Sequence, residues 1–166
     1  MDLILWRHAE AEELGQTGHN AHNAHNPPAA QDDLARRLTS RGEKQALRMA
    51  AWLERQLPDS ARVLVSPARR CEQTALALGA RYKLRPELAP DAAPLQLLEL
   101  VQWPLSKSPV VVVGHQPMLG QVIAQLLGFR ESECTLKKGA LWWLRSRERD
   151  GQCQTVVLTV QSPEFL

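Results

Sequence analysis

Several features that would assign a chain to a functional class are missing from this sequence. No stretch of its 166 residues approaches the roughly 18 consecutive apolar residues that a membrane span requires. The formal net charge of +2 is too small to indicate binding to nucleic acid or to an anionic membrane surface. The N-terminus has no basic segment followed by a long apolar region, so we expect no signal peptide. We therefore predict neither a membrane nor nucleic acid as a partner.

Cysteine is also scarce. Cys71, Cys134 and Cys153 are odd in number, and their spacing is not that of metal ligands. Reduced thiols of this kind are typical of cytoplasmic proteins. We predict a cytoplasmic location and no disulfide framework.

The length and composition are those of one globular domain. Hydrophobic residues make up 44% of the chain and charged residues 23%, which is ordinary for a protein with a packed core. The sequence turns polar after residue 8 and stays so for longer than most loops. We predict a single domain over residues 1–166, with an insertion loop over about residues 11–32.

A repeat of histidine and asparagine, from His19 to Asn26, lies within this insertion. One hypothesis is a metal site at His19, His22 and His25, because imidazole binds zinc, copper and nickel. However, no carboxylate or cysteine interleaves with these histidines, and nothing in the flanking sequence would begin or pack a helix. We favour a polar insertion and predict neither a metal nor another cofactor.

Short apolar runs indicate buried strands. Residues 3–6 and 62–65 are too short for helices and end abruptly in polar sequence. Four consecutive valines at 110–113 are typical of a central parallel strand that is buried on both faces. These three runs predict the middle of a parallel sheet.

Helical segments alternate with these strands. Apolar residues recur at helical spacing from Ala46 to Leu57, and Thr39 or Ser40 can cap that helix. Pro67 and Pro117 suit the first turns of two further helices. The tail differs, because two alternating segments flank Asp150-Gly151, a favourable hairpin turn.

Together these patterns predict an α/β fold. It is a three-layer sandwich with a mostly parallel central sheet, helices on both faces and an antiparallel edge. Trp142 and Trp143 are adjacent on one of the edge strands. We expect them to pack on opposite faces of the sheet.

Charged and polar side chains follow three of the predicted strands. Arg7 and His8 come directly after the first strand, and His115 comes directly after the valines. Arg70 lies about one helical turn after the second strand. Because ligands of open α/β sheets bind at the carboxyl ends of the strands, we expect these four residues to form one site.

Two arginines and two histidines that converge away from water need an anion to neutralise them. Phosphate fits best, because guanidinium groups bind its oxygens in a planar, bidentate manner. A neutral imidazole at His8 could attack phosphorus and form a covalent phosphohistidine. Arg7, Arg70 and His115 would then stabilise charge on the phosphoryl oxygens. This chemistry requires no metal.

Three segments of the chain resemble motifs of the histidine phosphatase superfamily. They are Leu5-Trp6-Arg7-His8-Ala9, residues 66–74 (SPARRCEQT), and Gly114-His115-Gln116-Pro117. The resemblance is greatest to the small SixA-type phosphohistidine phosphatases and includes residues 36–42, before the first long helix.

This resemblance implies a phosphoglycerate mutase-like fold and a metal-independent phosphatase with His8 as the phosphorylated nucleophile. Arg7 and Arg70 match the arginines that hold the phosphate, and His115 matches the second histidine. Arg36 falls where SixA-type proteins carry another arginine near the phosphate. Ala9 stands where much of the superfamily has glycine.

The leaving group decides between substrates. An alkyl phosphate leaves as an alkoxide and requires a positioned general acid, whereas a phosphohistidine leaves as imidazole and needs less help. Glu10, Glu12, Asp33 and Glu99 are the acidic candidates, and none is clearly placed for this role. Asp33 could serve as an acid or as a structural partner of Arg36.

We therefore expect a phosphatase that acts on phosphohistidine in a partner protein. The alternative is a phosphatase of a small phosphate ester, such as a nucleotide or a sugar phosphate. A third possibility, from another class, is a regulatory protein that binds phosphate without turnover. A metal-binding protein built on the His/Asn repeat ranks last.

Overall fold

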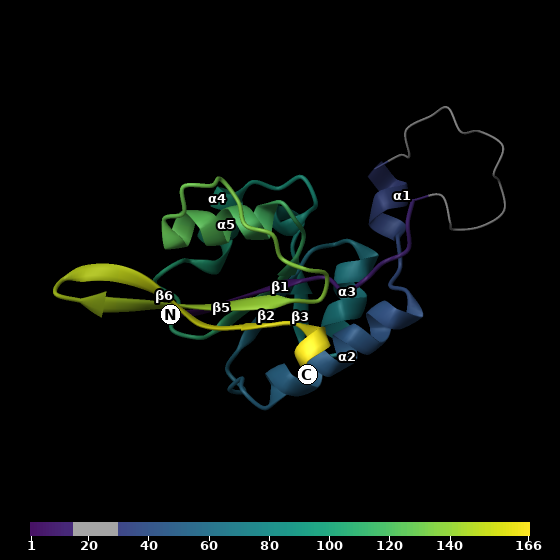
Figure 1. Cartoon of the computed structure of the whole chain (residues 1–166), viewed down its shortest axis with the longest axis horizontal. Helices are drawn as coiled ribbons and strands as arrows, with labels where there is room; N and C mark the ends of the chain where they lie inside the picture. Colours follow the sequence, from purple (N-terminus) through teal and green to yellow (C-terminus); the bar gives the residue numbers. More distant parts are fainter. Residues whose placement is uncertain (15–29) are drawn as a thin grey trace.

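The computed structural model describes residues 1–14 and 30–166 of the chain (Figure 1). Strands and helices alternate as the sequence predicts. In chain order the elements are β1 (Asp2–Arg7), α1 (Ala30–Ala35), α2 (Ser40–Glu54), β2 (Arg62–Val65), α3 (Arg69–Leu76), β3 (Tyr82–Leu84), the 3₁₀ helix η1 (Pro86–Leu88), α4 (Pro94–Val101), β4 (Val110–Gly114), α5 (Met118–Leu127), β5 (Leu141–Arg149), β6 (Gln152–Gln161) and the 3₁₀ helix η2 (Pro163–Phe165).

The six strands form one sheet in the order β3-β2-β4-β1-β5-β6. Strands β3, β2, β4 and β1 pair in parallel. Strands β5 and β6 add an antiparallel edge, and their hairpin extends beyond the helices in Figure 1. The mostly parallel sheet with an antiparallel edge confirms the predicted fold class.

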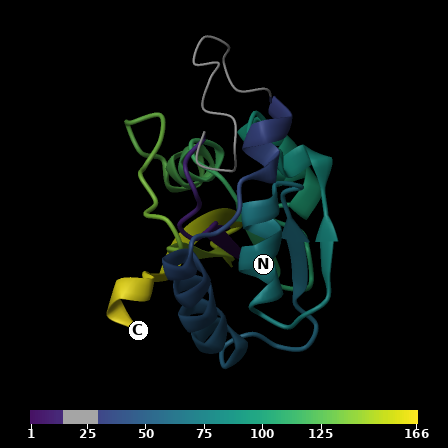
Figure 2. The ribbon, with the colours of Figure 1, turned by 90° about the vertical axis from the view of Figure 1, so that its right-hand side faces the viewer.

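Helices cover both faces of the sheet, because consecutive residues of its central strands are apolar and therefore point to both faces. Leu3 and Leu5 of β1 pack in a cluster with α4 and α5, whereas Ile4 and Trp6 pack in a cluster with α2 and α3. Figure 1 shows α4 and α5 above the sheet and α2 below it. In the perpendicular view of Figure 2, η2 lies beside α2.

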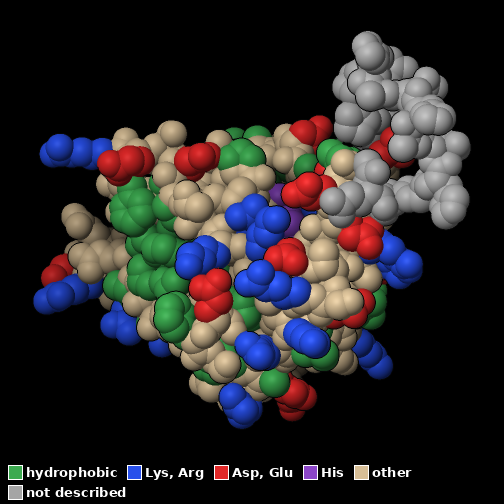
Figure 3. Space-filling view, turned by 45° about the vertical axis from the view of Figure 1, so that its right-hand side comes forward, with side chains coloured by type: hydrophobic (Ala, Val, Ile, Leu, Met, Phe, Trp, Pro, Cys, Tyr) green, Lys and Arg blue, Asp and Glu red, His purple; other side chains and the backbone are tan. Residues whose placement is uncertain are grey.

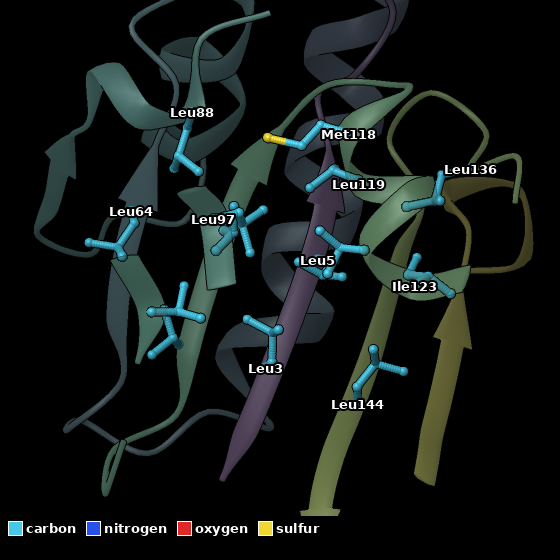
Figure 4. Packing of buried hydrophobic residues seen from close by; sticks show 14 residues of the cluster. Leu3, Leu5, Leu64, Leu88, Leu97, Met118, Leu119, Ile123, Leu136 and Leu144 are labelled. Carbon is cyan, nitrogen blue, oxygen red and sulfur yellow. The ribbon is translucent and has the colours of Figure 1, made fainter. Parts of the chain in front are cut away.

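Figure 4 shows the first cluster at close range, with Leu97 of α4 and Leu119 and Ile123 of α5 on the face of the sheet to which Leu3 and Leu5 point. All five residues of β4 are buried, as the run of valines predicts. Trp142 packs against the cluster of one face and Trp143 against that of the other, as expected. The two layers hold the central strands in fixed positions.

The first long helix begins where its sequence provides a cap. Thr39 is the N-cap of α2, and its Oγ1 accepts a hydrogen bond from the Gly42 amide at 3.0 Å. Helix α1 begins at Ala30, at the C-terminal end of the predicted insertion over about residues 11–32. Residues 15–29, including the His/Asn repeat, lie outside the described residues, so the metal hypothesis for that repeat stays untested.

The structure places the three free cysteines apart from one another, with Cys71 buried, Cys134 partly buried and Cys153 exposed. In the described ranges, 1–14 and 30–166, no helix is long and apolar enough to cross a membrane. Parallel pairing brings the carboxyl ends of β1, β2 and β4 to one edge of the sheet. This edge positions the candidate site.

Candidate active site

Backbone hydrogen bonds fix the three strand ends relative to one another. Arg7 is the register partner of Gly114, and the His8 amide donates to the Gly114 carbonyl at 3.1 Å. The Ser66 amide donates to the Val113 carbonyl at 3.0 Å. The residues that follow β1, β2 and β4 therefore emerge side by side, as the sequence predicts.

His8 has one ring nitrogen free to act as a nucleophile. Its Nδ1 lies 2.8 Å from the Ala9 carbonyl oxygen, which can only accept a hydrogen bond. The proton therefore lies on Nδ1, and Nε2 carries a lone pair. Arg70 Nε donates weakly to this Nε2 at 3.4 Å. The lone pair points toward a cation, where a phosphoryl group would meet it.

His115 faces the same point from β4. Its ring centroid lies 5.2 Å from that of His8. Arg70 Nη2 is 3.3 Å from His115 Nδ1, and because arginine only donates, Nδ1 accepts. The His115 proton therefore lies on Nε2, which donates to Ser66 Oγ at 2.7 Å.

Arg70 connects the two histidines with Asp33. It lies in the first turn of α3, and its residue is only 3% exposed. Besides its contacts with the two histidines, its Nη1 donates to the Asp33 carbonyl at 2.6 Å and its Nη2 to Asp33 Oδ2 at 3.0 Å. The neighbouring Arg69 pairs instead with Glu72 at the surface.

Arg36 approaches from the segment after α1. Its Nε and Nη2 donate to Asp33 Oδ1 at 3.0 and 2.9 Å, and its Nη1 donates to the Glu12 carbonyl at 3.1 Å. The structure thus places Arg36 with the four strand-end residues. It also makes Asp33 the partner of Arg36, one of the two roles that the sequence left open.

Arg7 contributes a further positive charge. Its Nη1 donates to the Leu136 carbonyl, and it makes no ion pair with any described residue. Its Nε is buried and has no hydrogen-bond partner in the described part of the chain. Burial, and then the charge of Arg70, lowers its pKa from the usual value. An anion beside this guanidinium would balance its charge.

These side chains line a cleft of about 360 Å³. Figure 3 shows the described histidines only as a small recessed patch among charged side chains. Cationic lining residues outnumber acidic ones by four to one. The cations are Arg7, Arg36, Arg70 and Lys138, and the carboxylate is Asp33. The cleft is therefore suited to an anion with more than one negative charge.

The other acidic candidates do not reach the cleft. Glu10 accepts a hydrogen bond from Thr39 Oγ1 at 2.8 Å and pairs with Arg41 at 3.6 Å, so it is held at the start of α2. Glu99 is exposed on α4. Asp33 is the only carboxylate among the described residues that line the cleft.

The sequence did not assign a role to Ser66 or Thr74, although both lie in the 66–74 motif. Ser66 Oγ accepts the Nε2 proton of His115 and holds that side of the ring. Thr74 Oγ1 accepts from the Ala9 amide at 3.1 Å and donates to the Arg70 carbonyl at 2.7 Å, which ties α3 to the end of β1. The available signal was their position in that motif, where Ser66 directly follows β2 and Thr74 lies one turn after Arg70 in α3.

Both imidazoles are neutral in the folded protein. Burial lowers the pKa of His8 to about 3 against the opposing effect of the Ala9 carbonyl, and the nearby charges of Arg70 and Arg7 lower it further. Burial, followed by the charge of Arg70, likewise lowers the pKa of His115 to about 3. His8 therefore keeps its lone pair at neutral and mildly acidic pH.

These shifts predict the titration of the site. We expect neither ring to gain a proton between about pH 8 and about pH 5. ¹⁵N-detected spectra of the imidazole nitrogens would measure this, with the signals assigned by means of His8→Asn and His115→Asn. Because the unfolded state binds these protons below its pKa of about 6.5, the free energy of unfolding should fall as the pH drops from there toward 3. Titration of either ring near pH 6.5 would contradict this expectation.

Comparison with known proteins agrees with this geometry. The sequence model of the histidine phosphatase superfamily (branch 1) matches residues 3–93. The chain is 29% identical over 146 residues to a phosphohistidine phosphatase SixA homolog of Haemophilus influenzae, covering 78% of this chain and 79% of the relative. It is 34% identical over 105 residues to phosphohistidine phosphatase SixA of Escherichia coli, covering 58% and 65%.

A solved structure of the protein histidine phosphatase SixA complexed with tungstate is also similar. It superposes with a TM-score of 0.69 at 25% identity and covers 99% of both chains. The region that matches the family model contains Arg7, His8, Arg36 and Arg70. The superposition with the tungstate complex also includes β4 and His115. The chain belongs to the histidine phosphatase superfamily.

Proposed function

We propose that this protein hydrolyses phosphohistidine on a partner protein, without a metal and through a phosphohistidine on its own His8. The observation that carries this proposal is the neutral Nε2 of His8, which faces Arg70 in a cationic cleft. The names of the relatives from H. influenzae and E. coli support the same substrate class.

In the first step the Nε2 lone pair of His8 attacks phosphorus. The bond from phosphorus to the substrate imidazole breaks, and that imidazole takes up a proton from solvent as it leaves. The Nδ1 proton, held by the Ala9 carbonyl, keeps the attacking ring in the productive orientation and carries the charge that the ring acquires. Arg7, Arg36 and Arg70 stabilise the phosphoryl oxygens.

In the second step water attacks phosphorus, and the bond to His8 Nε2 breaks. Inorganic phosphate leaves, and His8 returns to its neutral form. A phosphoryl oxygen at His115 Nδ1 replaces the weak contact with Arg70 and raises the pKa of that imidazole, so that it can share a proton with the oxygen. Ser66 holds the other side of the ring.

The lack of a suitable acid favours phosphohistidine over an ester. Asp33, the carboxylate of the cleft, accepts hydrogen bonds from two arginines. Burial would raise its pKa, but the hydrogen bond and charge of Arg70 and the charge of Arg36 outweigh this effect and lower it. An ionised carboxylate cannot protonate an alkoxide, whereas an imidazole leaves more easily.

The size of the cleft favours the same substrate. Its volume of about 360 Å³ is near the lower end of the roughly 300–1,000 Å³ that is usual for ligand sites. A phosphoryl group on a single ring fits this space better than a nucleotide does. The side chains of Pro90 and Lys138 also line the cleft and are available to contact the protein that carries the ring.

The test compares two substrates in the presence of a chelator. One is a small histidine phosphotransfer protein phosphorylated chemically with phosphoramidate, and the other is p-nitrophenyl phosphate. We expect the phosphoprotein to lose phosphate at a higher kcat/KM than the ester and with no effect of the chelator. Turnover of the ester alone would assign the protein to small-molecule phosphatases, and turnover of neither would favour a phosphate-binding regulatory protein.

A further inference from the structure

We infer that Asp33 is a positioning residue that orients Arg70 toward the phosphoryl group. This inference rests on the proposed function, because it assigns Asp33 a part in the same site. The residue lies in α1 and is partly exposed. It touches neither histidine through any hydrogen bond among the described residues, so its effect on the reaction must pass through the arginines.

The geometry of the guanidinium group carries the argument. Arginine has two edges that can each bind an oxyanion with two parallel hydrogen bonds, one formed by Nη1 and Nη2 and the other by Nε and Nη2. Asp33 occupies the first edge, through its carbonyl at Nη1 and its Oδ2 at Nη2. The second edge faces His8 Nε2 and His115 Nδ1, where the phosphoryl group must bind.

The contact lengths show which bonds an incoming phosphate would replace. The two bonds to Asp33 measure 2.6 and 3.0 Å, whereas those to the histidines measure 3.4 and 3.3 Å. The longer contacts are weak and give way to phosphoryl oxygens. The shorter ones remain and keep the guanidinium plane in place.

Asp33 also joins Arg70 to Arg36. Its Oδ1 accepts from Arg36 while its Oδ2 accepts from Arg70, so one carboxylate holds two cations on the same side of the cleft. Without its charge, the two guanidinium groups would repel each other and lose a fixed geometry. Preorganised cations stabilise the transition state better than mobile ones.

Two other roles for this carboxylate make different predictions. If Asp33 competed with phosphate for Arg70, its removal would strengthen the binding of oxyanions. If it were a general acid, its removal would slow esters with poor leaving groups most and would change the alkaline limb of the pH profile. A positioning role weakens oxyanion binding and affects every leaving group to the same degree.

The test uses Asp33→Asn, which keeps the shape of the side chain and removes its charge. Asp32→Asn is the matched control, because Asp32 is the preceding residue of α1, is exposed and makes no ion pair among the described residues. Tungstate binding would be measured by calorimetry, and kcat, KM and their pH profiles with the phosphoprotein and the aryl phosphate. Asp33→Ala repeats the test with a side chain that forms no new hydrogen bond.

We expect Asp33→Asn to weaken tungstate binding and to lower kcat/KM by about 10-fold to 100-fold, as for other residues that orient a binding group. Both substrates should lose the same factor, the alkaline limb should stay unchanged, and Asp32→Asn should match the wild type. Tighter tungstate binding, or a loss confined to one substrate, would overturn the inference. A wild-type protein that binds tungstate but does not turn over phosphohistidine would refute the proposed function alone.

Discussion

Replacing His8 with alanine is expected to lower the turnover of every phosphorylated substrate by about 10⁴-fold or more, because the nucleophile is lost. The hydrogen bond to the Ala9 carbonyl and the contact with Arg70 Nε disappear with the ring. Arg70 cannot replace it, since a guanidinium group has no lone pair to donate. Steady-state rates with the phosphoprotein and the aryl phosphate would measure the loss.

A trapping experiment distinguishes two causes of the lost activity of His8→Ala, the absence of the nucleophile and a failure to bind the substrate. The wild-type protein, mixed with ³²P-labelled phosphoprotein and denatured in alkali, should retain label that is stable in base and labile in acid. His8→Ala should retain none, although it should still bind tungstate. Labelling of His8→Ala, or turnover above about a hundredth of the wild-type rate, would contradict the covalent mechanism.

Arg70→Lys is expected to lower kcat/KM by about 10²-fold to 10³-fold, although it conserves the charge. A lysine ammonium is a single point of donation. It cannot bind Asp33 on one side and present two parallel donors to a phosphoryl group on the other, as the two edges of Arg70 do. The loss should be accompanied by weaker tungstate binding.

Arg69→Lys is the matched control for this substitution. Arg69 precedes Arg70 in α3, but its side chain is 42% exposed and pairs with Glu72, and it does not line the cleft. We expect its kcat/KM to stay within about twofold of the wild-type value. An Arg70→Lys variant as active as this control would show that bidentate binding is not required.

The fold could be predicted from sequence where one local pattern had one interpretation. Four valines can hardly form anything but a buried strand, and β4 is buried along its whole length. Gly128 directly follows the last apolar residue of α5 and closes the helix in the left-handed conformation. Helix α1 was missed, because a helix of six residues has too little periodicity to be recognised.

Part of the site could likewise be predicted from the sequence, and part could not. Arg7, His8, Arg70 and His115 lie at strand ends or in the first turn after one, so the rule for open sheets was enough to bring them together. The edge of Arg70 that Asp33 occupies could not be predicted, because the two residues are 37 positions apart and meet only through the packing of α1 beside α3. Their roles in catalysis stay predictions until the variants are measured.

The division of the site between the sheet and α1 has a consequence for local opening. The His8 amide is hydrogen-bonded to Gly114 between buried strands, so its hydrogen should exchange with solvent only when the whole domain unfolds. A helix as short as α1 has little stability of its own and is held to the core in part through the ion pairs of Asp33. The backbone amides of α1 should exchange through smaller fluctuations. His8 therefore belongs to the part of the chain that is most protected from exchange, and Asp33, which orients Arg70, belongs to one of the least protected parts.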